Sequence, residues 1–296
     1  MSLFGITSQL SALPTPLLGL FGGVLGLVIG SYAATVLIRW PRGERANRGR
    51  SRCDGCARQL RWYELIPALS FVMANGKCRS CKRPVARRHL VLEVLFGLAG
   101  GVFFALGEPG LPPAVWLLIL LAGFDSLHLW LPNRLVALLA ALALLTPRWA
   151  EGVSIADQVF GGIAGFAGLW IVALVFRRAT GRNGMGGGDP KLFGAIGLLM
   201  GWRVLPYVMI LACVLGMFDA AIRFGRSGKL RSVQLPFGAY LALSTIGLVW
   251  WQISVQARPM PDSTPSLTQA ALQTQPAARL PRFARQSPAD QAMSSD

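Results

Sequence analysis

The stretch PLLGLFGGVLGLVIGSYAATVLI, residues Pro16–Ile38, decides the class of fold. It carries no charged side chain, and no Lys, Arg, Asp or Glu precedes it from Met1 onward. A run of about 20 apolar residues is long enough to cross the hydrocarbon core of a bilayer as a helix. A cleaved secretory signal would have a basic segment before its apolar core. The stretch is therefore predicted to be a permanent membrane span.

The rest of the chain repeats this pattern. Of 296 residues, 53% are hydrophobic and 14% are charged, whereas an ordinary soluble domain has about 25% charged residues. The apolar runs predict an all-α polytopic membrane protein with about eight transmembrane helices. The predicted spans are Pro16–Ile38, Leu90–Leu106, Leu111–Phe124, Leu131–Thr146, Val153–Phe176, two spans within Leu192–Ile222 that are broken near Trp202-Arg203, and Leu235–Ile253.

Most of the net charge of +16 comes from one polar loop. Between Arg39 and Arg88 there are 14 Lys and Arg residues against Glu44, Asp54 and Glu64. The positive-inside rule places this loop in the cytoplasm and the N-terminus outside. A loop that binds nucleic acid is the rival interpretation, but basic residues beside a span are an ordinary result of topology. We therefore expect membrane lipid and no nucleic acid as a partner.

Four parts are predicted along the chain. Residues 1–38 hold the first span, residues 39–89 form the basic loop, and residues 90–255 form the rest of the transmembrane bundle. Residues 256–296 are rich in Gln, Ser, Pro and Ala and lack an apolar run, so they are predicted to be a disordered tail. Within the spans, glycines recur every four residues, a spacing that lets two helices approach closely. These glycines are Gly22, Gly26, Gly30, Gly161 and Gly165.

Four cysteines of the basic loop form two CxxC pairs, Cys53 with Cys56 and Cys78 with Cys81. Two such pairs at this separation are typical of a tetrahedral four-cysteine zinc site. Turns at Asp54-Gly55 and Arg79-Ser80 would aim each pair of thiolates at one metal ion. Stable disulfides are the alternative, which a reducing cytoplasm disfavours. The predicted zinc is structural, because all four ligands come from the protein. Cys213 lies in an apolar span and is predicted to be buried.

Acidic residues within or beside spans are few, and such residues are functional candidates. Asp125 closes the third predicted span, in Gly123-Phe124-Asp125, and Asp189 follows the glycine-rich run Gly184–Gly188. The predicted topology brings both to the cytoplasmic boundary. The residues alone leave two interpretations open, an acid–base pair or two aspartates that cap helices. Glu93 and Asp219 also lie near cytoplasmic span ends, and we expect structural roles for them.

Several motifs together resemble the type IV prepilin peptidase family, up to about residue 255. The opening pattern appears as Gly30-Ser31-Tyr32 with Arg39-Trp40-Pro41, and the four-cysteine loop contains Trp62–Pro67. The GxGD signature corresponds to Gly186–Asp189, and Pro236-Phe237-Gly238 resembles the start of the family's last span. Leu127 and Asn133 stand where the family's first aspartate motif commonly carries further acids, and His89 replaces a usual tyrosine.

The resemblance implies a bifunctional enzyme of the bacterial inner membrane. Such enzymes cut the short basic leader from type IV prepilins and type II secretion pseudopilins, after a glycine and at the cytoplasmic face. They then methylate the new N-terminal residue with S-adenosylmethionine. Asp125 and Asp189 would be the catalytic aspartates, since one of two adjacent carboxylates stays protonated while the other is charged. The sequence places no binding site for S-adenosylmethionine.

Two other classes of function remain as alternatives. A non-catalytic zinc-loop scaffold for pilus or secretion assembly would keep the cysteines and the glycines, but it would not need Asp125 or Asp189. A proton-coupled transporter would place its acids near the middle of the bilayer, often in repeated halves. The sequence shows no such repeat, so the transporter ranks last.

Overall fold

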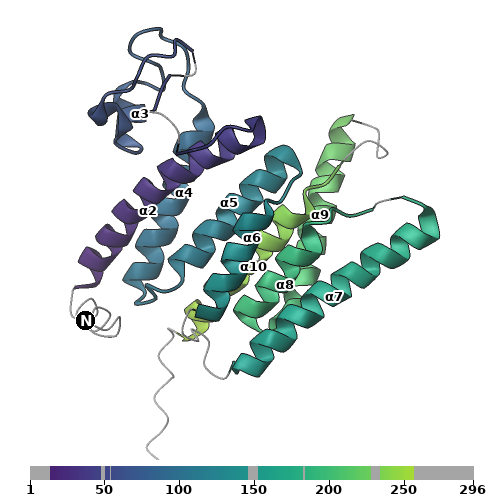
Figure 1. Cartoon of the computed structure of the whole chain (residues 1–296). Coiled ribbons are helices and arrows are strands. Elements are labelled where there is room, and N and C mark those ends of the chain that lie inside the picture. The colour runs from purple at the N-terminus through teal and green to yellow at the C-terminus, as the bar shows by residue number, and fades with distance from the viewer. Residues whose placement is uncertain are drawn as a thin grey trace, which may run out of the picture. The chain divides into compact units, whose positions relative to one another are not determined.

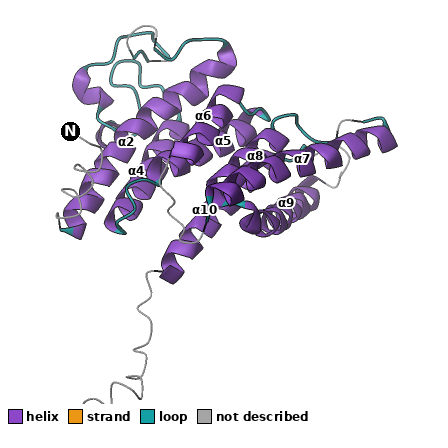
Figure 2. Ribbon diagram, turned by 60° about the horizontal axis from the view of Figure 1, so that its bottom comes forward, coloured by secondary structure: helices purple, strands orange, loops and turns teal. Residues whose placement is uncertain are grey.

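The structure is a computed structural model that describes residues 14–47, 51–53, 55–145, 153–182, 184–227 and 234–256. Helices and loops make up these residues (Figure 2), apart from two isolated bridges in the cysteine loop. The predicted all-α class is confirmed. The predicted disordered tail lies outside the described residues, except for Gln256, and so does Asp54.

The described residues contain eight helices of twelve or more residues (Figure 1). They are α2 (Thr15–Arg39), α4 (Arg87–Ala105), α5 (Pro112–His128), α6 (Asn133–Leu145), α7 (Ile155–Thr180), α8 (Asp189–Met200), α9 (Leu205–Ser227) and α10 (Phe237–Gln256). The shorter elements are η1 (Trp40–Arg42), η2 (Trp62–Leu65), α3 (Leu69–Met73) and η3 (Trp202–Val204). The predicted break near Trp202-Arg203 is confirmed, because η3 separates α8 from α9.

Five of the described helices are long and apolar enough to cross a membrane, which supports the predicted polytopic fold. They are Thr15–Arg42, Arg87–Ala105, Ile155–Thr180, Trp202–Gly225 and Phe237–Val255. Helices α5 and α6 are apolar but shorter. Helix α8 has 12 residues, or about 18 Å of helix against a hydrocarbon core of about 30 Å. The count of eight full spans therefore stays a prediction.

Glycines bring two pairs of helices into close contact. Helix α2 lies along α4, and α7 lies along α8 (Figure 1). A Cβ atom at Gly30 of α2 would lie 2.9 Å from the backbone oxygen of Leu92, and one at Gly161 of α7 would lie 2.6 Å from that of Gly197. Any larger side chain would push the helices apart. The predicted packing role of these glycines agrees with the structure.

Two expectations need correction. Helix α5 does not end at Phe124 but continues for one more turn to His128, so Asp125 lies within the helix. The helix ends there because Leu129 adopts a left-handed conformation, with φ of 50°, and donates its N–H to the Asp125 backbone oxygen. Cys213 is exposed on α9 rather than buried. Lipid-facing and core positions are equally apolar in a membrane helix, so hydropathy does not separate them.

Candidate active site and metal-binding loop

Asp125 sits in the last turn of α5, at the end of the bundle that carries the cysteine loop. Helix α4 leaves this loop at Arg87, and α5 returns toward it. The Asp125 side chain is buried, with 6% of the residue exposed. Its Oδ2 atom accepts a 2.9 Å hydrogen bond from the backbone N–H of Ala239, in the first turn of α10. This bond fixes one carboxylate oxygen and leaves Oδ1 for other partners.

Asp189 is the first residue of α8 and is equally buried, with 5% exposed. Its Oδ2 atom accepts a 3.2 Å hydrogen bond from the backbone N–H of Gly186. The last glycine of the preceding run packs closely here, since a Cβ atom at Gly188 would lie 2.8 Å from the Cβ atom of Leu131. Gly188, which directly precedes Asp189, therefore lies against the loop between α5 and α6.

Gly238 lies close to both carboxylates. A Cβ atom on this residue would be 3.1 Å from Asp125 Oδ2 and 3.1 Å from Asp189 Oδ1. These two oxygens are therefore separated by at most twice that distance. The structure thus brings Asp125 and Asp189 close together, whereas their place at the cytoplasmic boundary stays a prediction. Three helices contribute to the site, since α5 and α8 supply the carboxylates and α10 supplies Gly238 and Ala239.

The surroundings of the pair are not strongly charged. Neither carboxylate takes part in the ion pairs found among the described residues, which are Arg58 with Glu64 and Arg223 with Asp219. The nearest lysine in sequence, Lys191, instead donates a 2.9 Å hydrogen bond to Oδ1 of Asn133. Two buried carboxylates this close, without a salt bridge, favour a state in which they share one proton.

The other two acids have structural partners, in agreement with their predicted roles. Glu93, in α4, accepts a 2.8 Å hydrogen bond from the backbone N–H of Ala68 and so ties the cysteine loop to the bundle. Asp219, in α9, pairs with Arg223 and accepts a hydrogen bond from the hydroxyl of Tyr240. Tyr240 directly follows Ala239, so this contact anchors the start of α10 beside Asp125.

The four cysteines form a compact cluster, as the spacing predicted. The Sγ atoms of Cys53, Cys56, Cys78 and Cys81 all lie within 4.8 Å of one another and could hold a metal ion. The Cys53 and Cys81 Sγ atoms are 3.7 Å apart. Tetrahedral zinc with Zn–S bonds of about 2.3 Å needs sulfur atoms about 3.8 Å apart. The donor set and its size therefore fit zinc.

The two CxxC pairs fold in the same way. The backbone N–H of Cys53 donates to the Arg58 oxygen, and that of Cys78 donates to the Arg83 oxygen, each at 2.9 Å. The residue after each second cysteine, Ala57 or Lys82, has φ of 56°. Hydrogen bonds from the backbone N–H groups of Cys81 and Ser80 lower the pKa of Cys78 to about 6. Such a thiol is largely a thiolate at neutral pH, the form that binds metals.

Sequence reasoning missed the contribution of α10 to the active site. The motif Pro236-Phe237-Gly238 does not by itself indicate a role for Gly238 or for the N–H of Ala239. A glycine in the first turn of an otherwise apolar helix is the signal that was available, because glycine weakens a helix unless close packing requires it.

The fold and the site define a class, a multi-span helical membrane protein with two buried carboxylates at one end and a four-cysteine loop at the same end. Residues 24–106 match the bacterial peptidase A24 N-terminal domain, and residues 114–220, which include both aspartates, match the type IV leader peptidase family. The chain belongs to the type IV leader peptidase family.

Its relatives include three prepilin leader peptidase/N-methyltransferases. The protein of Stutzerimonas stutzeri is 30% identical over 77% of this chain and 89% of the relative. That of Burkholderia pseudomallei (strain K96243) is 32% identical over 80% of this chain and 87% of the relative. That of Aeromonas hydrophila is 33% identical over 68% of this chain and 71% of the relative. No solved structure matches the chain.

Proposed function

We propose that this protein is an aspartic endopeptidase that removes the leader from type IV prepilins and type II secretion pseudopilins, after a glycine. The observation that carries the proposal is the meeting of two buried carboxylates, Asp125 and Asp189, beside Gly238. Family membership supplies the substrate class, since the relatives are prepilin leader peptidases. A scaffold without catalysis would not need two acids held at one point.

The geometry supports a mechanism in which the two carboxylates share one proton. The charged carboxylate takes a proton from water, while the protonated one donates a hydrogen bond to the scissile carbonyl oxygen. Water then attacks the carbonyl carbon, and the carboxylate that took the proton from water passes it to the leaving amine. The N–H groups of Ala239 and Gly186 each hold one oxygen of a carboxylate in place. The proton belongs to the pair, so neither role is assigned to one residue.

The proposed location is the bacterial inner membrane, with the active site and cysteine loop in the cytoplasm. The excess of basic residues in the loop supports this orientation. The loop also exposes apolar side chains, namely 78% of Trp62, 65% of Val72 and 64% of Met73. An exposed tryptophan among arginines suits an anionic lipid surface. Membrane lipid is therefore a proposed partner of residues 39–89, and residues 90–255 are proposed as the catalytic bundle.

We also propose that the metal of the cysteine loop is zinc with a structural role. Cys53, Cys56, Cys78 and Cys81 would occupy all four positions of a tetrahedral site and leave none open for substrate. Zinc would hold together a loop in which Cys78 is the one buried apolar residue of the described positions between Trp40 and Val91. Its binding energy would then count directly toward the folding of the loop.

N-methylation of the new N-terminal residue is proposed on the names of the relatives, with S-adenosylmethionine as the methyl donor. The described residues form one groove along α4, α5 and α10 and another along α6, α7 and α8. Both are lined mainly by apolar side chains and neither contains a carboxylate. They do not fit a donor with ribose hydroxyls and a cationic sulfonium.

The experiment that tests the proposal is incubation of the detergent-purified protein with a prepilin, followed by N-terminal sequencing of the product. The expected product begins directly after the glycine that ends the leader. With S-adenosylmethionine present, the mass of the new N-terminal residue should rise by one methyl group. An uncut prepilin, under conditions in which a relative such as the Burkholderia pseudomallei enzyme cuts it, would favour the scaffold.

A further inference from the structure

Three polar side chains connect α9 to the first turn of α10. The hydroxyl of Tyr240, in α10, donates a hydrogen bond to Oδ2 of Asp219, in α9. The same carboxylate oxygen lies 2.7 Å from Nε of Arg223, one helical turn further along α9. Arg223 therefore fixes the Asp219 carboxylate on α9, and this carboxylate fixes the Tyr240 hydroxyl.

The ring of Tyr240 also has a fitted place on α9. Tyr240 is buried, with 7% of the residue exposed. A Cβ atom at Gly216 of α9 would lie 3.3 Å from Cδ2 and 3.4 Å from Cε2 of the ring. Gly216 and Asp219 are three residues apart, a spacing that puts both on one face of a helix. One face of α9 therefore contacts both the ring and the hydroxyl of Tyr240.

The residue directly before Tyr240 binds a catalytic carboxylate. The backbone N–H group of Ala239 donates to Oδ2 of Asp125 at 2.9 Å and to the backbone oxygen of Pro236 at 3.2 Å. The two acceptors therefore compete for one donor. A small rotation of the first turn of α10 would favour one acceptor over the other, because a hydrogen bond weakens as its angle departs from linear. Adjacent residues of a helix move together, so the place of Tyr240 sets this rotation.

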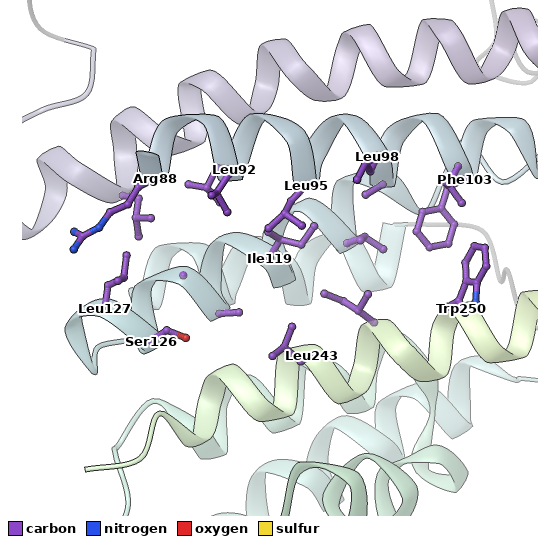
Figure 3. Close-up of a pocket in the computed structure, with 18 of the residues that line it drawn as sticks. Arg88, Leu92, Leu95, Leu98, Phe103, Ile119, Ser126, Leu127, Leu243 and Trp250 are labelled. Carbon is purple, nitrogen blue, oxygen red and sulfur yellow. The ribbon is translucent and has the colours of Figure 1, made fainter. Parts of the chain in front are cut away.

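Beyond its first turn, α10 borders an apolar groove of about 660 Å³ that α4 and α5 also line (Figure 3). Leu243 and Trp250 of α10 face this space (Figure 3). Protein interiors are otherwise close-packed, so the groove marks a stretch where α10 does not pack closely against α4. The contacts of its first turn with α5 and α9 are then more important for the placement of α10.

We infer that Tyr240 is a positioning residue for leader cleavage, held by Asp219 and Arg223 so that the Ala239 N–H group stays on Asp125. The inference rests on the proposed peptidase function and adds a residue to it. The Tyr240 hydroxyl is engaged by Asp219, so Tyr240 acts through the backbone of Ala239. A contact that only joins two helices would support the fold, whereas a positioning contact also sets the rate of the chemical step.

The test separates these two roles by kcat for prepilin cleavage. Tyr240→Phe keeps the ring against Gly216 and removes the hydroxyl, and Asp219→Leu removes the acceptor. We expect each to lower kcat at least fivefold with KM unchanged, because the reaction depends on close positioning. Asp219→Asn keeps an oxygen that can accept from the Tyr240 hydroxyl. Its kcat should stay within about twofold of the wild-type value.

Tyr32→Phe is the matched control for Tyr240→Phe. It too removes one hydroxyl hydrogen bond, which Tyr32 of α2 donates to Oδ1 of Asn47 at 2.6 Å. This bond involves none of the helices α5, α8 and α10, so kcat should keep its wild-type value. Thermal unfolding of both variants in detergent shows whether each remains folded at the assay temperature.

Hydrogen exchange, measured by mass spectrometry on the detergent-purified protein, gives a readout that does not depend on activity. The backbone amides of residues 237–241 should exchange faster in Tyr240→Phe than in the wild-type protein or in Tyr32→Phe. Unchanged exchange there, or wild-type kcat in Tyr240→Phe and Asp219→Leu, would overturn the inference. If the wild-type protein cuts no prepilin, the proposed function fails instead, and exchange alone reports whether Tyr240 holds the start of α10.

Discussion

The backbone N–H of Ala239 donates a 2.9 Å hydrogen bond to Oδ2 of Asp125, across 114 positions of the sequence. This bond connects the first turn of α10 to the last turn of α5. The preceding residue, Gly238, lies close to one carboxylate oxygen of Asp125 and to one of Asp189. The start of α10 is therefore part of the active site, even though it supplies no ionisable side chain to the pair.

The first prediction concerns Gly238. In Gly238→Ala the added Cβ atom would lie 2.8 Å from Leu131 Cδ1 and 3.1 Å from one oxygen of each catalytic carboxylate. The carboxylates or the start of α10 must then move by a few tenths of an ångström. We expect kcat for prepilin cleavage to fall at least tenfold, because the reaction depends on close positioning. Cleavage of a prepilin at matched enzyme concentration measures this effect.

Gly247→Ala is the matched control, since it makes the same substitution on the same helix. A Cβ atom at Gly247 would have no neighbour within 4 Å. Alanine also favours the helix by about 0.5–1 kcal/mol relative to glycine. Gly247→Ala should thus retain activity and be at least as stable as the wild-type protein. Equal activity of the two variants would contradict a positioning role for Gly238.

The second prediction concerns the two carboxylates. Asp125→Asn and Asp189→Asn should each abolish leader cleavage, because Asn keeps the shape of Asp but neither accepts nor returns a proton. The double variant should be no worse than either single variant, since one substitution already breaks the shared-proton pair. The two single variants should still insert into the membrane and keep their metal, because an aspartate that merely caps a helix contributes about 1 kcal/mol to stability.

Two other acids serve as controls for the carboxylate variants. Glu93→Gln and Asp219→Asn keep the hydrogen-bond acceptors for Ala68 and Tyr240. They should retain most of the cleavage activity. Near wild-type cleavage by Asp125→Asn or by Asp189→Asn would show that the pair is not catalytic, and the scaffold function would then gain support.

Much of the fold could be predicted because the bilayer simplifies the problem. Long apolar runs must form helices in a membrane, since their backbone groups find no water there. The break near Trp202-Arg203 and the cysteine cluster also followed from local sequence. The extra turn of α5 could not be predicted in this way. The helix ends where Leu129 takes a left-handed conformation, and the residue types after Phe124 do not mark that position.

The candidate site could be predicted only in part. Asp125 and Asp189 stood out because acids are rare in apolar spans. Gly238 and Ala239 did not stand out, since their role depends on a backbone approach from a helix distant in the sequence. The exposure of Cys213 could not be predicted from the sequence either, because a residue facing lipid and a residue facing the core can have the same hydropathy.

The third prediction concerns the metal. The purified protein should contain one zinc ion per chain, and Cys81→Ser should lower its zinc content and expose the cysteine loop to protease. Cys213→Ser is the matched control, since Cys213 lies on α9, outside the four-cysteine cluster. It should keep full zinc content. Mass spectrometry of the metal content measures the zinc per chain. The assignment would be contradicted if native protein, prepared without chelators, held no zinc.

The last prediction concerns the contact of α7 with α8, the helix that begins at Asp189. In Gly161→Ala the added Cβ atom would lie 2.6 Å from the backbone oxygen of Gly197 and 2.7 Å from the backbone nitrogen of Trp202. Backbone atoms cannot move aside as a flexible side chain does, so the two helices must separate. Overpacking of this kind costs about 1–3 kcal/mol. We expect a lower unfolding temperature in detergent and reduced cleavage, because α8 carries one of the catalytic carboxylates.

Gly168→Ala is the control on the same helix, since a Cβ atom at Gly168 would meet nothing within 4 Å. It should match or exceed the stability of the wild-type protein, as the intrinsic helix preference of alanine is then the main effect. Thermal unfolding of both variants, monitored by circular dichroism, distinguishes the effect of close helix packing from that of intrinsic helix preference. An equal loss of stability in both would mean that glycine is required for helix flexibility in the membrane, and that close approach of α7 to α8 is not the reason for Gly161.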